Sequence, residues 1–172
     1  SFSFKTKPIL DVFCLSTLYA IRLVYGHVIT EIAPSPWLLV FCVFFFLSLA
    51  FMKRSTELHK SEKNEQRLSA RRGYETADGL LVRIAGMSSG LISILVLAFY
   101  TTSAQVTMLY LYPEFLWGAA YVLLYWKLRL WLIATRGKMH QDPVVFAIKD
   151  KGSYIMGALI ILFAALAKGI LI

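Results

Sequence analysis

The chain has 172 residues, of which 58% are hydrophobic, 15% aromatic and only 16% charged, and its mean hydropathy is positive. These few polar residues cannot cover the surface of an ordinary water-soluble domain. We therefore expect the chain to lie in a lipid bilayer. The net charge of +8 raises the possibility of a nucleic-acid partner, but most of the basic residues lie in alternate connections rather than over a domain surface, and we expect no nucleic-acid binding.

Five apolar runs are long enough to predict membrane-spanning helices, because a span needs roughly 20 mostly apolar residues. A helical bundle in water needs amphipathic helices with polar outer faces, and residues 41–51 offer none. We therefore predict an all-α integral membrane protein with a single transmembrane domain over residues 1–172. The predicted spans are about 9–30, 36–52, 84–104, 113–134 and 153–172.

The basic residues predict how these spans are oriented. Lys and Arg occur before the first span, in the 53–83 connection and in the 136–151 connection, whereas residues 27–36 and 101–113 contain neither. By the positive-inside rule, the N-terminus and both basic connections face the cytoplasm. We expect an integral plasma (inner) membrane protein with its polar site on the cytoplasmic face.

Two predicted spans contain charged residues, which are costly in a bilayer and are usually partnered or functional. Asp11 and Arg22 are eleven residues, or three turns, apart, so they share a helix face that we expect to point into the bundle. Lys127 and Arg129 lie near the cytoplasmic end of the fourth span. Snorkelling to the interface and binding of an anion both remain open for this pair.

Three polar clusters flank the spans on the predicted cytoplasmic side. In the first, Glu57 is either the i+4 ion-pair partner of Lys53 or a metal-binding carboxylate beside cations that hold phosphate, and the spacing leaves both open. The second cluster contains Arg72, Tyr74 and Asp78, and the third contains Asp142 and Asp150. Each cluster alone is typical of a solvated helix end, but three on one membrane face predict a phosphate-handling site.

At these residues the chain resembles the second half, helices five to nine, of the UbiA-type intramembrane prenyltransferase superfamily. The similarity is greatest to the decaprenyl-phosphate phosphoribosyltransferase branch. It is carried by residues 4–11 (FKTKPILD), 19–22 (YAIR), 53–58 (KRSTEL), 72–74 (RGY) and 142–150 (DPVVFAIKD). The chain opens Ser-Phe-Ser-Phe without a Met and is expected to be a piece of a longer protein, because the family's first acidic motif and helices one to four are absent.

The resemblance implies Mg²⁺-dependent transfer of 5-phosphoribosyl from phosphoribosyl pyrophosphate to a polyprenyl phosphate, with the missing N-terminal half completing the site. Prenyl transfer from a polyprenyl diphosphate is the alternative within the family, and a non-catalytic transporter or lipid-binding fragment is the alternative outside it. The candidate residues are Glu57 (catalytic and metal-binding), Asp78 (catalytic), Lys53, Arg54, Arg22, Arg72, Tyr74, Lys127 and Arg129 (substrate phosphates), and Asp11, Asp142 and Asp150 (supporting).

Overall fold

The computed structural model describes residues 7–30, 35–64, 73–139 and 142–170, and all regular secondary structure in these ranges is helical. The predicted all-α class is therefore confirmed for the described part of the chain, and each predicted span coincides with a long helix. The long helices are α1 (Leu10–Thr30), α2 (Pro36–Asn64), α3 (Gly79–Thr101), α5 (Phe115–Thr135) and α7 (Lys151–Lys168). The short helices are η3 (Thr76–Asp78), α4 (Ala104–Leu109) and α6 (Pro143–Lys149).

Three of the described helices are long and apolar enough to cross a membrane: α2 over Pro36–Lys60, α3 and α7. The sequence predicted five spans, so this part of the prediction is confirmed for three of the five. The other two long helices carry charged residues within their apolar runs. Asp11 and Arg22 lie on α1, and Lys127 and Arg129 lie on α5.

The boundaries of two helices differ from the predicted spans. The second span was predicted to end at residue 52, but α2 continues to Asn64, and α3 begins at Gly79 rather than at 84. The apolar run marks the limit of burial in lipid, whereas Lys, Arg and Glu are themselves good helix formers and extend the helix beyond it. At about 1.5 Å per residue, a helix of 29 residues exceeds the roughly 30 Å hydrocarbon core.

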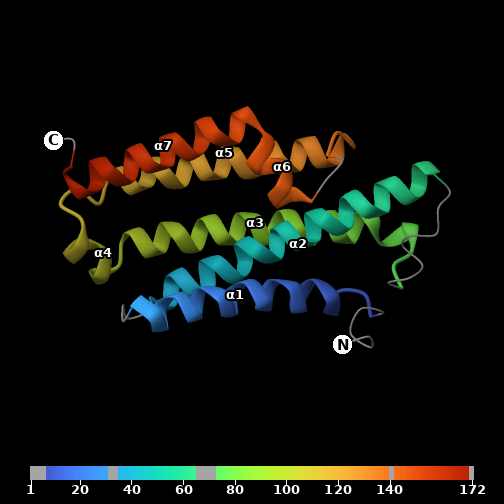
Figure 1. Ribbon diagram of the computed structural model, residues 1–172, viewed down its shortest axis with the longest axis horizontal. Coiled ribbons are helices and arrows are strands. Elements are labelled where there is room, and N and C mark those ends of the chain that lie inside the picture. Colours follow the sequence, from blue (N-terminus) through green and yellow to red (C-terminus); the bar gives the residue numbers. More distant parts are fainter. Residues whose placement is uncertain (1–6, 31–34, 65–72, 140–141, 171–172) are drawn as a thin grey trace.

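The long helices pack in chain order across the bundle (Figure 1): α1 contacts α2, α2 contacts α3, α3 contacts α5, and α5 contacts α7. Helix α6 lies against both α7 and α2. The start of α1, the end of α2, the start of α3 and the end of α5 lie at one end of the bundle, while α4 and the C-terminus lie at the other (Figure 1). The helix ends that flank the basic connections are thus at the same end, as the predicted orientation requires.

The buried core lies toward this end and is centred on Trp131 of α5, whose side chain is 2% exposed. The indole N–H donates to Ser48 Oγ on α2, with 3.2 Å between the heavy atoms. Gly86 on α3 makes room for the ring, because a Cβ at this position would lie 2.5 Å from the indole and 2.7 Å from Phe51 Cβ. This close contact joins α2, α3 and α5 beneath the polar end of the bundle.

Candidate functional site

A buried polar cluster joins α1, α2 and the segment before η3, and consists of Asp11, Arg54, Glu57 and Tyr74 (the Arg54 cluster). Arg54 donates from Nε to Asp11 Oδ2 and from Nη1 to Glu57 Oε2, each at 2.5 Å. The Tyr74 hydroxyl donates to Asp11 Oδ1 at 2.8 Å. The Arg54 and Asp11 side chains are only 7% and 5% exposed, whereas that of Glu57 is 38% exposed. Glu57 is therefore the open edge of a cluster whose centre is closed.

Tyr74 also fixes the start of α1. Its hydroxyl oxygen accepts a hydrogen bond from the Ile9 N–H at 2.7 Å, and Ile9 has a φ of 69°, which is unusual for a β-branched residue. Burial raises the pKa of Tyr74, and the neighbouring Asp11 carboxylate raises it further. The hydroxyl is thus protonated at neutral pH and holds both groups.

A second ion pair links α2 to α6. The Lys53 ammonium donates to Asp142 Oδ2 at 2.6 Å, and Asp142 Oδ1 accepts from the Val144 N–H at 3.0 Å, capping α6. The sequence offered Glu57 as the surface ion-pair partner of Lys53. That pairing is wrong, because Lys53 pairs with Asp142 and Glu57 pairs with Arg54.

A third ion pair links α5 to α7. Arg129 donates through both terminal nitrogens to the two Asp150 oxygens, at 2.5 and 3.0 Å. Asp150 caps α7 by accepting from the backbone N–H and the hydroxyl of Ser153. The hydrogen bond from Arg129, with those from Ser153, lowers the pKa of Asp150 to about 2. Asp150 is therefore a carboxylate throughout the physiological pH range.

Of the two other predicted phosphate-binding cations within the long helices, Lys127 is buried and Arg22 is exposed. Lys127 is 2% exposed and donates to the backbone oxygen of Phe45 at 3.1 Å, so it does not snorkel. Arg22 is exposed and lies 5.4 Å from the centre of the Tyr19 ring, so the prediction that it faces the bundle interior with Asp11 is wrong. Asp11 is covered by Arg54 of α2 and by Tyr74 before η3, and neither of these residues is recorded in contact with Arg22.

Asp78 and Arg72 complete the set of predicted site residues. Asp78 Oδ2 accepts from the Glu75 N–H at 2.9 Å and makes no side-chain cap to α3, so it stabilises its own turn. Arg72 lies outside the described residues.

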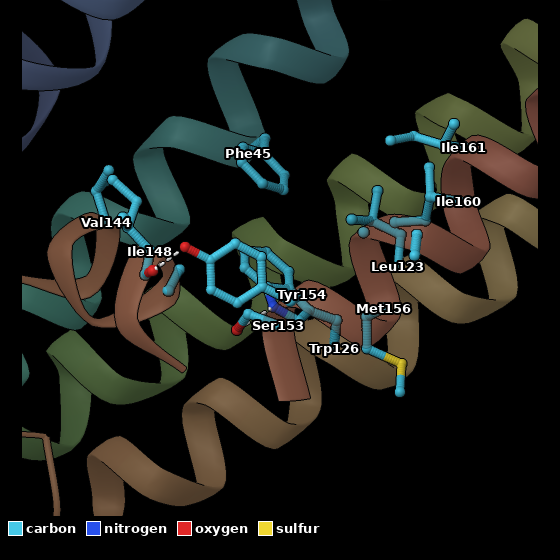
Figure 2. Close-up of a pocket in the computed structure, with 13 residues that line it drawn as sticks. Phe45, Leu123, Trp126, Val144, Ile148, Ser153, Tyr154, Met156, Ile160 and Ile161 are labelled. Carbon is cyan, nitrogen blue, oxygen red and sulfur yellow. Dashed lines mark hydrogen bonds between the residues drawn. The ribbon is translucent and has the colours of Figure 1, made fainter. Parts of the chain in front are cut away.

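An apolar groove of about 770 Å³, which the sequence did not reveal, lies between α2, α5, α6 and α7 (Figure 2). Its few polar groups are engaged with one another. The Trp126 indole N–H donates to the Ser153 hydroxyl at 2.9 Å, and the Tyr154 hydroxyl donates to the Ile148 oxygen at 2.5 Å. Gly157 and Ala158 on α7 help to leave this space. Because α7 is apolar on every side, its sequence gives no sign of which side faces the groove.

The described residues do not by themselves fit a Mg²⁺ site. No group of three His, Cys, Asp or Glu side chains among them is placed to hold a metal ion. Glu57 is the most accessible acid of the Arg54 cluster, but Arg54 occupies one of its oxygens. Mg²⁺ is usually bound by one or two carboxylates together with water and substrate phosphates, so any such site here needs groups from beyond these residues.

Two curated proteins are similar to this chain. The uncharacterized protein y4nM of Sinorhizobium fredii (strain NGR234) is 39% identical over 161 residues, which cover 93% of this chain and 31% of that protein. The nodulation protein NoeC of Azorhizobium caulinodans is 30% identical over 152 residues, which cover 88% of this chain and 49% of that protein. The chain thus spans about half the length, or less, of these relatives. No family model and no solved structure matches the chain.

Proposed function

We propose that this chain is the second half of a UbiA-type membrane transferase that transfers 5-phosphoribosyl from phosphoribosyl pyrophosphate to a polyprenyl phosphate. The sequence resemblance described above suggests the reaction. Its structural support is one juxtaposition: an apolar groove borders ion pairs at the end of the bundle that carries the basic connections.

The Lys53–Asp142 and Arg129–Asp150 ion pairs are connected directly to the groove. Ser153 lines it and is hydrogen-bonded to Asp150, the partner of Arg129. Val144 also lines it, and its N–H is bonded to Asp142, the partner of Lys53. A molecule with a long hydrocarbon chain and an anionic head matches this arrangement, because the chain avoids water in the groove while the head meets cations at its end.

In the proposed reaction, an oxygen of the polyprenyl phosphate attacks C1 of the donor ribose, the bond from C1 to the diphosphate oxygen breaks, and pyrophosphate leaves. Lys53 and Arg129 hold oxygens of the polyprenyl phosphate in place of part of their contact with Asp142 and Asp150, which positions the attacking oxygen. Arg54 stays within its buried cluster and supports Glu57 at the open edge.

The proposal includes two features beyond the three candidate spans. Helices α1 and α5 also cross the plasma membrane, and the end with the ion pairs faces the cytoplasm. Both relatives are at least about twice as long as the matched region, which leaves room for a companion half that carries the first acidic motif.

The test is a transfer assay with the full-length protein in membrane vesicles, using phosphoribosyl pyrophosphate labelled in the ribose and an added polyprenyl phosphate. We expect a labelled lipid product from the parent and from Lys168→Ala, a cation at the opposite end of the bundle. Lys53→Ala and Arg129→Ala are expected to lower the rate at least about tenfold. A folded protein that makes no such product contradicts the proposal, and product formed from a prenyl diphosphate instead assigns prenyl transfer.

A further inference from the structure

Lys127 is a buried lysine whose ammonium makes both of its recorded interactions with a single residue, Phe45. Its ammonium donates to the backbone oxygen of Phe45 at 3.1 Å and lies 3.9 Å from the centre of the Phe45 ring. Among the described residues Lys53, Arg54 and Arg129 each pair with a carboxylate, and Lys127 does not. A buried ammonium is costly, and such a residue in a membrane protein usually serves a function.

Phe45 connects this cation to the groove. Its ring lines the groove and stacks on that of Trp126, with the ring centres 6.0 Å apart and the planes 6° from parallel. Trp126 lines the groove as well and is anchored by its hydrogen bond to Ser153. Figure 2 shows Phe45 projecting from α2 on the side of the groove opposite α7. Lys127 itself is not among the lining residues, so the Phe45 ring contacts the groove and the ammonium at once.

We propose that Lys127 is a positioning residue for the lipid substrate: it fixes the Phe45 ring, and through it the Phe45–Trp126 wall that guides the polyprenyl chain. This inference rests on the proposed function. The cation over the face of the Phe45 ring adds a directional attraction to the packing of the ring against Trp126, and the hydrogen bond to the Phe45 backbone oxygen holds the ammonium in that place. When Lys127 or the Phe45 ring is lost, the polyprenyl chain can move toward α2 and α5, and its phosphate is then no longer aligned with the donor.

The kinetic test compares Lys127→Met, Lys127→Arg and Phe45→Leu in the full-length protein. For Lys127→Met and Phe45→Leu, we expect KM for polyprenyl phosphate to rise about tenfold while kcat and KM for the donor stay within about twofold. Lys127→Arg keeps a cation over the ring and should restore KM to within about threefold of the parent. The double variant should be no worse than either single variant, because both act through one wall. If Lys127 served only in folding, its loss would lower the amount of active protein and hence the apparent kcat, and KM for polyprenyl phosphate would not rise.

A binding readout keeps the inference testable apart from the reaction. A photoreactive benzophenone side chain at Ile160, which lines the groove, should crosslink to a radiolabelled polyprenyl phosphate, and one at the exposed Leu95 of α3 reports on bulk lipid. Lys127→Met and Phe45→Leu should lower crosslinking at position 160 but not at 95. If no transfer is detected but both variants lower crosslinking at position 160 only, the proposed reaction is wrong and the role of Lys127 in positioning the lipid is supported. Unchanged KM and crosslinking in folded Lys127→Met and Phe45→Leu overturn the inference.

Discussion

Arg54 and Asp11 are joined by a 2.5 Å hydrogen bond between two nearly inaccessible side chains that lie 43 residues apart in the sequence. The pair attaches the edge helix α1 to α2. Removal of a buried acceptor leaves buried donors unsatisfied, which costs more than the loss of an exposed ion pair. The two carboxylates that contact Arg54 should therefore differ sharply in their contribution to stability.

Asp11→Ala should lower the free energy of unfolding by about 2–4 kcal/mol, because it removes the buried acceptor of both Arg54 Nε and the Tyr74 hydroxyl, and Arg54 keeps only Glu57 as a carboxylate partner. Glu57→Gln, at the exposed edge of the cluster, should cost no more than about 1 kcal/mol and leave the fold intact. Thermal unfolding in detergent measures both. Equal destabilisation by the two variants would show that the centre and the edge of the cluster do not differ.

Gly86→Ala should destabilise the protein by about 1–3 kcal/mol, because the new methyl group would overlap the Trp131 ring and Phe51 Cβ. Gly157→Ala is the matched control in α7, where a Cβ meets nothing within 4 Å. It should be neutral or stabilise by up to about 1 kcal/mol, because alanine favours the helix. The same unfolding measurement checks this pair, and a destabilising Gly157→Ala would show that this face of α7 is covered by another segment.

The Arg129–Asp150 pair should contribute constant stability over ordinary pH values. Asp150 has a pKa of about 2 in the folded protein, below the roughly 3.9 of an unfolded aspartate. Its contribution is therefore complete above about pH 4 and is lost as the pH falls through about 2. The difference in Tm between the parent and Asp150→Asn should not change between about pH 5 and 8 and should shrink below about pH 4. A difference that changes near neutral pH would show that another group controls this pair.

The orientation of the bundle can be tested with single cysteines in a background lacking Cys14 and Cys42. Lys151→Cys at the start of α7 should be labelled from the cytoplasmic side, and Met108→Cys in α4, 87% exposed, from the opposite side. Impermeant maleimide applied to intact cells and to inverted vesicles distinguishes the two. Labelling of both residues from one side would contradict the proposed orientation.

The positions of the long helices followed from apolar runs alone, because a helix in lipid must satisfy its own backbone groups over a fixed thickness. The short helix α6 was missed, although its signal was present: Asp142 accepts a hydrogen bond as the N-cap, and Pro143 follows in the first turn. A seven-residue helix has too few apolar positions to be detected by periodicity.

The ion-pair partners could not be predicted from spacing along one helix. Lys53 and Arg129 each pair with a carboxylate on another element, at a sequence separation of 89 and 21 residues. Asp11 and Arg22 do share a helix face, but Asp11 is covered by Arg54 and Tyr74, whereas Arg22 is exposed one turn beyond the stacked Tyr19 and Phe46 rings. The groove escaped prediction for a similar reason, because it is formed by side chains from four helices.

The most direct test of lipid binding in the groove is an experimental structure of the full-length protein in lipid nanodiscs with a bound polyprenyl phosphate. We predict that the hydrocarbon chain lies in the groove against Phe45 and Trp126, with its phosphate within hydrogen-bonding distance of Lys53 or Arg129. A groove filled by a helix from the rest of the protein, with the phosphate bound elsewhere, would contradict binding of the lipid substrate in this groove.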